Sequence, residues 1–243
     1  MSISHDDWPG RERRSPRRTS PDYLVLAPLV SHLSAELRRH CAGRTGLSAL
    51  DVGCGDKPYY PLFDPYVASY LGFDIAPGPM VDDVGRAERL PYGDESFDLV
   101  VCTQVLEHAD DPAAVVSELR RVLRPEGLAL VSTHGVFVFH PVPPPDRDYW
   151  RWTHAGLVRL FRSTGEWNEM RVHANGELVS CIAFLFLRLL GWPLGGLPAG
   201  FRAVVFSVVN RVAEFVERRL PADLQVPSPN SLTVNYLVSA TKA

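Results

Sequence analysis

Two acids and a glycine turn are the residues of this chain best placed to do chemistry. Residues 50–57 read LDVGCGDK, in which Asp51 sits near the end of an apolar run and Gly53 and Gly55 follow at once. A second apolar run ends in a similar way at Asp74. A loop of this kind could cradle a phosphate, hold a metal, carry a redox cysteine or form the floor of a nucleoside pocket.

The glycine spacing disfavours the common phosphate-binding loops. A dinucleotide site of the GxGxxG type needs a third glycine, and Pro58 occupies that place. A Walker loop needs Ser or Thr directly after its lysine, whereas Lys57 is followed by Pro58. Acids at two strand ends repel a pyrophosphate but can accept the hydroxyl groups of a ribose. The pattern therefore favours a ligand that carries an amine and a sugar.

Alternating apolar runs and helical stripes predict the elements that must position these acids. We expect strands at 48–52, 70–73, 80–84, 97–102 and 128–132, a helix over 28–40, and a helix capped by Asp111 and Pro112 that a turn at 124–127 ends. Strands that alternate with helices indicate an α/β fold with a doubly wound, mostly parallel sheet. Ligands of such sheets bind outside the carboxyl ends of the strands, where both acids fall.

Composition narrows the class of protein. With 243 residues, 46% of them hydrophobic, the chain can bury one large core. A net charge of -3 gives no basic surface for nucleic acid. The four cysteines lie far apart with no CxxC pair, so we expect reduced thiols and no metal site, and Cys54 as a small pocket-wall residue.

The sequence predicts a short tail and one domain. Residues 1–22 are rich in Arg, Ser and Pro, a composition typical of a flexible N-terminal tail. Residues 23–243 are expected to form the domain, with a hydrophobic helical insertion at 177–222 before the last strand. The first apolar segment has no small-residue cleavage site after it, which favours a cytoplasmic protein, or a membrane-associated one.

Five segments in the same order resemble the class I S-adenosylmethionine-dependent methyltransferases, in the small-molecule group called type 11. They are LDVGCG, YLGFD, ERLPYGDESFDLVV, CTQVLEHADDP and ELRRVLRPEGLALVS, within residues 47–173. The resemblance implies a Rossmann-like methyltransferase fold with a seven-stranded sheet, whose last two strands, at 166–173 and 232–239, form an antiparallel pair. It also implies S-adenosyl-L-methionine (SAM) as the cofactor and methyl transfer as the activity.

Carried over by position, the resemblance implies ten cofactor-binding residues. They are Asp51, Gly53, Cys54 and Gly55 at the methionine half, Asp74 at the ribose, Ile75, Ala87 and Glu88 at the adenine, and Thr103 and Gln104 beneath the sulfonium. Two positions depart from the family pattern: Asp56 replaces the third glycine, and Arg86 replaces the acid before the adenine-facing alanine. Because of the second departure, we expect a backbone carbonyl, in place of the acid, to accept the hydrogen bond from N6 of the adenine.

Acceptor chemistry needs a base and a binding surface past the fourth and fifth strands. His108, His134 and His140 are the candidate catalytic bases, each with the alternative of a structural loop histidine. Residues 148–153 resemble the PDYWRWT segment of methyltransferases from polysaccharide and glycolipid clusters, with a helix expected to follow over 153–163. The candidate substrate residues there are Tyr149, Trp150, Arg151 and Trp152, with Arg147 or Arg151 to grip a phosphate or carboxylate. The alternative is that they pin the loop over the sheet.

The apolar run at 178–190 is too short, and too interrupted by Arg188, for a transmembrane helix. Together with the apolar stripe from Phe201 to Val216 it predicts a helical hairpin within 178–219. It could cap the pocket, form a homodimer face or make a peripheral membrane contact. The expected function is methyl transfer to oxygen of a small or lipid-linked acceptor, a sugar or a natural product. Alternatives are a C-methyltransferase of a quinone-like or lipid acceptor, a non-catalytic SAM-fold partner protein and, least supported, a nicotinamide dehydrogenase.

Overall fold

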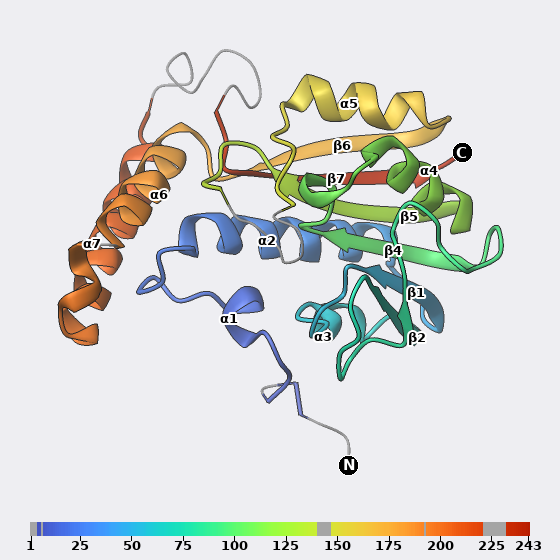
Figure 1. Ribbon diagram of the computed structural model, residues 1–243, viewed down its shortest axis with the longest axis horizontal. Coiled ribbons are helices and arrows are strands. Elements are labelled where there is room, and N and C mark those ends of the chain that lie inside the picture. Colours follow the sequence, from blue (N-terminus) through green and yellow to red (C-terminus); the bar gives the residue numbers. More distant parts are fainter. Residues whose placement is uncertain (1–3, 6, 140–146, 192, 221–231) are drawn as a thin grey trace.

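The chain folds into one seven-stranded mixed sheet with helices on both faces (Figure 1). The computed structural model describes residues 4–5, 7–139, 147–191, 193–220 and 232–243. The strand order is β3-β2-β1-β4-β5-β7-β6. Strands β1 to β5 pair in parallel, and β7 runs antiparallel to its neighbours β5 and β6. This order confirms the doubly wound, mostly parallel sheet that the sequence predicts.

The strands lie close to their expected positions. Their bounds are β1 Leu47–Val52, β2 Val67–Asp74, β3 Asp83–Val84, β4 Phe97–Thr103, β5 Leu123–His134, β6 Trp167–Asn175 and β7 Asn235–Lys242. The turn predicted at 124–127 is instead an irregularity inside β5. Phe97 already pairs with Leu123 before it, and regular pairing resumes where Leu99 meets Leu128.

The helices also lie close to their expected positions, with one exception at the start of α2. Their bounds are α1 Arg11–Arg14, α2 Tyr23–His40, α3 Tyr60–Phe63, η1 Leu106–His108, α4 Pro112–Val122, α5 His154–Ser163, α6 Leu178–Gly191, η2 Pro193–Gly196 and α7 Ala199–Glu217. The prediction that α2 begins at Pro28 is wrong by about one and a half turns. Leu24 and Val25 are buried and extend the apolar face of α2 ahead of the proline.

Two apolar layers enclose the sheet because successive residues of a strand point to opposite faces. Leu99 and Val101 of β4 pack in the layer formed with α2, whereas Val100 and Cys102 pack in the layer formed with α4 and α5. In Figure 1, α2 lies on one side of the sheet and α5 on the other. Asp111 caps α4 by accepting hydrogen bonds from the backbone N–H groups of the second and third residues of the helix, as expected.

The N-terminal segment packs on the domain where the sequence predicts a flexible tail. Arg14 is buried, and its guanidinium donates to the carbonyls of His5 and Trp8 at 2.6 and 2.7 Å. The Trp8 indole donates to Lys57 O at 2.8 Å and its ring lies 4.5 Å from that of Tyr60. Composition misses these contacts because backbone carbonyls and one aromatic pair hold the segment, with little apolar burial.

Helices α6 and α7 lie between β6 and β7 in the chain and pack together at one end of the molecule (Figure 1). Phe184 and Cys181 of α6 are fully buried against Val25 of α2 and Val234. No helix in the described part of the chain is long and apolar enough to cross a membrane.

Candidate functional site

The turn after β1 is shaped by a position that has no room for a side chain. Gly53 has a φ of 71°, and a Cβ added there would lie 2.2 Å from Cγ2 of Val105. Its N–H donates to Phe73 O at 2.8 Å, which ties the turn to the end of β2. Glycine is therefore required both by the left-handed backbone and by the contact with Val105.

Asp74 lies at the end of β2, next to this turn. Its carboxylate accepts hydrogen bonds from the N–H groups of Gly55 at 2.9 Å and Ala76 at 3.2 Å. Each carboxylate oxygen uses one lone pair in this way and keeps another for a ligand hydroxyl. The exposed Ile75 follows directly and offers an apolar surface beside it.

A cavity of about 450 Å³ opens at this edge of the sheet. Its size is in the range of pockets that hold ligands as large as drugs and cofactors. It is lined by Val52, Gly53, Phe73, Asp74, Ile75, Ala76, Gly85, Arg86, Ala87, Glu88, Gln104, Val105, His108, Ala109 and Arg147. Six of the ten residues expected at the cofactor therefore line one cavity: Gly53, Asp74, Ile75, Ala87, Glu88 and Gln104.

The other four expected residues do not line the cavity. Asp51 is buried and accepts a hydrogen bond from Tyr70 Oη at 2.7 Å, and burial raises its pKa to about 7. Cys54 is buried too, and burial raises the pKa of its thiol to about 12, which keeps it protonated. Gly55 acts through its N–H on Asp74, and Thr103 is buried in β4.

The cavity wall formed by residues 85–88 carries Arg86, one of the two residues that depart from the family pattern. Arg86 forms ion pairs with Glu88 and Asp110, and Glu88 also accepts from the N–H of Asp110 at 3.1 Å. The arginine therefore joins two acids across the mouth of the cavity. Its positive charge stands where the sequence pattern would place an acid.

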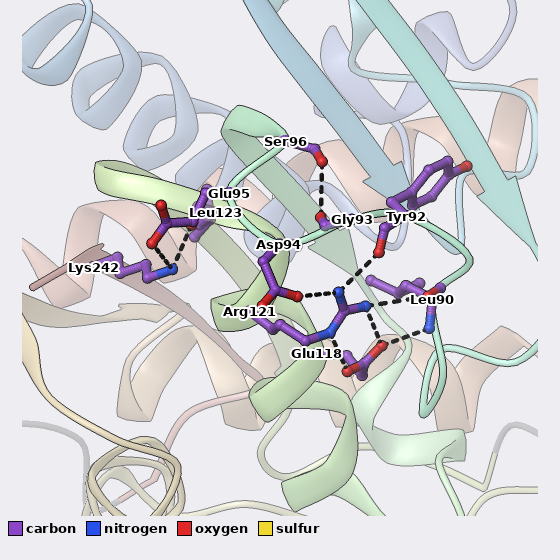
Figure 2. Close-up of polar contacts among 10 residues, drawn as sticks. All are labelled: Leu90, Tyr92, Gly93, Asp94, Glu95, Ser96, Glu118, Arg121, Leu123 and Lys242. Atoms are coloured by element: carbon purple, nitrogen blue, oxygen red, sulfur yellow. Dashed lines mark hydrogen bonds and ion pairs between the residues drawn. The ribbon is translucent and has the colours of Figure 1, made fainter.

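A network around Arg121 holds the chain segment that follows this wall (Figure 2). The guanidinium donates to Tyr92 O and Asp94 Oδ1 at 2.8 Å each and pairs with Glu118 at 2.7 Å. Glu118 in turn accepts from the N–H of Leu90 at 2.7 Å. These contacts fasten the segment to α4, so the wall formed by residues 85–88 is anchored on its far side.

Gln104 closes the floor of the cavity in an uncommon backbone conformation. Its φ is 59°, a region that a residue other than glycine seldom adopts. Its N–H donates to Ser132 O and its side-chain amide donates to Ser132 Oγ, both at 2.9 Å. Conformations of this kind cluster at functional sites.

His108 lines the cavity together with Arg147. Its Nδ1 donates to the backbone carbonyl of Arg147. In the neutral ring the proton is therefore on Nδ1, and Nε2 is the basic nitrogen. The Nε of Arg147 is buried with no hydrogen-bond partner among the described residues.

Glu107, which the sequence analysis misses, lies behind His108 and is completely buried. Its carboxyl accepts from Thr133 Oγ1 at 2.8 Å and lies 3.3 Å from Nδ1 of His134. Burial raises its pKa to about 7. The signal in the sequence was a glutamate between Leu106 and His108, directly after the apolar pair Val105 and Leu106.

His134 belongs to this buried cluster and does not line the cavity. It is 4% exposed, its ring stacks on Phe137 at 3.8 Å, and its centroid lies 6.5 Å from that of His108. Of the two candidate bases among the described residues, His108 lines the cavity and His134 does not. His140 lies outside the described residues.

The aromatic segment 149–152 borders the cavity without lining it. The N–H groups of Tyr149 and Trp150 donate to Glu107 O, and the Trp150 indole donates to Ala109 O at 2.9 Å. Trp150 stacks with Trp152 at 5.8 Å, and Arg151 pairs with Asp148 at 2.6 Å. The described residues contain no group of three His, Cys, Asp or Glu side chains that could hold a metal.

Comparisons with known proteins agree with this geometry. Residues 50–131 match the family model described as a methyltransferase domain. A probable S-adenosylmethionine-dependent methyltransferase of Mycolicibacterium smegmatis is 39% identical over 115 residues, which are 43% of this chain and 44% of that protein. A ubiquinone biosynthesis O-methyltransferase of Pseudomonas paraeruginosa is 31% identical over 109 residues, which are 38% of this chain and 46% of that protein. The chain spans about half the length of the curated relatives it matches.

The fold has solved counterparts as well. The phosphoethanolamine N-methyltransferase 2 of Haemonchus contortus, in complex with S-adenosyl-L-methionine, aligns with a TM-score of 0.54 at 17% identity, over 99% of this chain and 60% of that one. The matched methyltransferase domain, residues 50–131, contains strands β1, β2 and β4, which form the cavity, and this part of the chain resembles the S-adenosylmethionine-dependent methyltransferases.

Proposed function

We propose that this chain transfers a methyl group from SAM to an oxygen of a small or lipid-linked acceptor, a sugar or a natural product. The observation that carries the proposal is a single cavity that is lined by both Asp74 and His108. The first group suits the ribose of the cofactor, and the second suits an acceptor that must lose a proton.

The residues present fit the cofactor. Asp74 keeps a lone pair on each carboxylate oxygen for the two ribose hydroxyls, and Ile75 offers an apolar surface for the adenine. Gly53 lines the cavity with its backbone, because Val105 fills the place where a Cβ would stand. Glu88 also lines the cavity. Because its carboxylate forms an ion pair with Arg86, it is less able to accept a hydrogen bond from the amino group of the adenine.

Alkylation of a hydroxyl needs a base and correct alignment of the acceptor. When bound, SAM supplies an electrophilic methyl group with its own leaving group. His108 Nε2 accepts the proton of the acceptor hydroxyl as the new bond to oxygen forms. The carbonyl of Arg147 holds the ring in the tautomer that this step requires.

Arg147 and the aromatic segment support the acceptor class. The guanidinium of Arg147 lines the cavity beside His108 and suits a phosphate or carboxylate on the acceptor. Trp150 is 40% exposed and anchored to Ala109, a lining residue, which suits stacking on a sugar or ring. The similarity to a ubiquinone biosynthesis O-methyltransferase supports transfer to oxygen.

The test measures methyl transfer from isotopically labelled SAM to sugars, lipid-linked sugars and quinols, with product analysis by mass spectrometry. His108→Gln is expected to lower kcat by about 100-fold or more on an oxygen acceptor, the scale of a lost base. Binding of S-adenosylhomocysteine should stay unchanged. The control is His154→Gln, because His154 lies on α5 and does not line the cavity.

Two other functions have their own outcomes in this test. Label on carbon in the product would indicate the C-methyltransferase of a quinone-like or lipid acceptor. Tight binding of S-adenosylhomocysteine with no turnover on any acceptor would indicate a non-catalytic partner protein. Equal activity of His108→Gln and the wild type would contradict the role of His108 as base.

A further inference from the structure

Helix α7 has its apolar face turned toward solvent. Phe201, Val204, Val208, Val212 and Phe215 recur at spacings of three and four, so they lie along one face, and every one of them is more than half exposed. The buried residues of α7 are only Asn210 and Ala213. A helix that packs on a core in water shows the reverse arrangement.

The polar face of α7 makes the contacts with the rest of the molecule. Asn210 Nδ2 donates to the carbonyls of Arg18 and Ser20 at 2.7 and 2.9 Å. Glu214 pairs with Arg18 at 3.0 Å and accepts from Tyr23. Specific polar bonds thus fix this orientation of the helix.

Glu217, one turn further along the same face, is bound to the start of α6. It accepts from the N–H of Val179 at 3.2 Å and from the hydroxyl of Ser180. Asn210, Glu214 and Glu217 stand at i, i+4 and i+7, so one polar stripe faces inward along the last two turns.

Helix α6 adds to the outward apolar face. Its buried residues are Ser180, Cys181, Phe184 and Leu187, whereas Ile182, Phe186 and Leu189 on the other side are about half to three-quarters exposed. Both helices lie side by side at one end of the molecule (Figure 1). We call the eight exposed residues of the two helices the outer face: Ile182, Phe186, Leu189, Phe201, Val204, Val208, Val212 and Phe215.

Basic side chains flank the outer face. Between 178 and 220 the chain has five arginines and two glutamates, and both glutamates point inward. Arg211, Arg218 and Arg219 are exposed and form no ion pair with a carboxylate in the described ranges. The guanidinium of Arg219 lies 3.6 Å over the ring of Phe215, at the end of the face.

We propose that the outer face docks on an anionic lipid surface. An apolar face bordered by arginines matches the acyl chains and the charged headgroups of such a layer, with the long arginine stems reaching back to the headgroups. A second copy of the chain matches it less well, because the acids of α7 that could meet these arginines face inward. The helices lie on the layer, since neither can span it.

Ring contacts connect the docked helices with His108, which lines the cavity. Phe184 of α6 packs against Phe137 at 5.2 Å, Phe137 stacks on His134, and the ring of His134 adjoins that of His108. This row of ring contacts thus links the docked helices to His108, the proposed base. This link rests on the proposed function, whereas docking itself does not.

Co-sedimentation of the full chain with vesicles tests the proposal. The chain is expected to bind vesicles of phosphatidylcholine mixed with phosphatidylglycerol and to bind phosphatidylcholine alone much more weakly, with binding that falls as salt rises. Val204→Ser/Val208→Ser/Val212→Ser should lower the partition onto the mixed vesicles by about tenfold. Because these valines are exposed, the variant should keep the thermal stability of the wild type.

A charge reversal with a matched control separates docking from general charge. Arg211→Glu/Arg218→Glu should lower binding by about tenfold or more, at roughly 1 kcal/mol for each arginine. Arg159→Glu/Arg162→Glu makes the same change on exposed positions of α5 and should leave binding near that of the wild type after allowance for net charge. Equal loss in both variants would contradict a specific face.

Two further outcomes would overturn the proposal. The first is no binding of the wild type to either kind of vesicle. The second is a dimer, seen by sedimentation velocity in the absence of lipid, that the triple serine variant dissolves. A second copy of the chain would then cover the outer face. Loss of methyl transfer with intact vesicle binding would count only against the proposed function.

Discussion

The carboxyl edge of the sheet and the α6–α7 pair use apolar residues in opposite ways. The apolar residues of β1 and β4 are buried, and polar groups such as Asp74, Gln104 and His108 face a cavity. In α7 a buried Asn210 faces inward and a row of valines faces out. Both regions are regular secondary structure with strongly apolar sequences.

This difference separates what apolar residues do for folding from what they do for binding. At the sheet edge they supply the free energy of folding and hold the site rigid. On α7 they add little to folding, because they stay in water, and polar bonds hold the helix in place. The two regions should therefore respond differently to the same kind of mutation.

The largest difference is expected from truncation of apolar residues. Leu119→Ala in α4 removes a side chain that is 0% exposed and should lower the free energy of unfolding by about 2–5 kcal/mol. Val208→Ala in α7, at a position 54% exposed, should change it by less than about 0.5 kcal/mol. Denaturant unfolding of both variants measures this. Similar losses would mean that the outer face is buried in the protein as it exists in solution.

The buried carboxyl behind the cavity predicts a dependence of stability on pH. Because burial raises the pKa of Glu107 in the folded chain to about 7, from an ordinary value of 4.5, the folded chain keeps a proton that the unfolded chain releases. The stability from this group is present below about pH 4.5 and is lost as the pH rises through about 7.

Glu107→Gln tests this sign because glutamine cannot ionise. The stability of the variant relative to the wild type should increase between about pH 5 and about pH 8, by on the order of 2 kcal/mol. Subtracting the stability of the wild type from that of the variant at each pH cancels the titration of the histidines, which both proteins contain. A constant difference across this range would show that Glu107 is ionised in the folded state, paired with its neighbour His134.

A smaller effect is expected from the inward polar face of α7. Asn210→Ala leaves the carbonyls of Arg18 and Ser20 without this donor and should cost about 1–2 kcal/mol. Hydrogen exchange should show faster opening of α7 with the sheet unchanged. Arg211→Ala, on the exposed neighbouring position, is the control and should leave exchange as in the wild type. Equal protection in both variants would contradict the view that polar bonds hold this helix.

The sheet and the cavity at its edge were largely predictable because burial and chemistry both constrain the sequence there. The almost uniformly apolar stretch FDLVVC predicts a strand that is covered on both faces of the sheet. The structure has such a strand there, β4 from Phe97 to Thr103. Gly53 and Asp74 stand at strand ends, and the topology of the sheet brings them together. Asp51 stands at a strand end too, but its side chain points into the interior, which one-dimensional spacing does not reveal.

The acceptor end and the outer face were less predictable. In the sequence, His108 and His134 both fall near the ends of strands at the correct edge of the sheet. The structure distinguishes them, because His134 packs on Phe137 and His108 lines the cavity. The stripe from Phe201 to Val216 predicts a helix correctly, but the period of a stripe does not tell which side faces water. Which side of α7 faces the protein depends on the bonds of Asn210 and Glu214 to the N-terminal segment. The composition of that segment predicts a flexible tail, so these bonds could not be foreseen.

The most direct test of the central claim, that the cavity at the sheet edge binds SAM through Asp74, is calorimetric titration of S-adenosylhomocysteine. We expect the wild type to bind, and Asp74→Ala to bind about 10- to 150-fold more weakly, the scale of a lost charged hydrogen bond. Asp56→Ala removes an equal charge from the exposed part of the same loop and should bind like the wild type. No binding by the wild type, or equal weakening in the two variants, would contradict the assignment of this cavity to the cofactor.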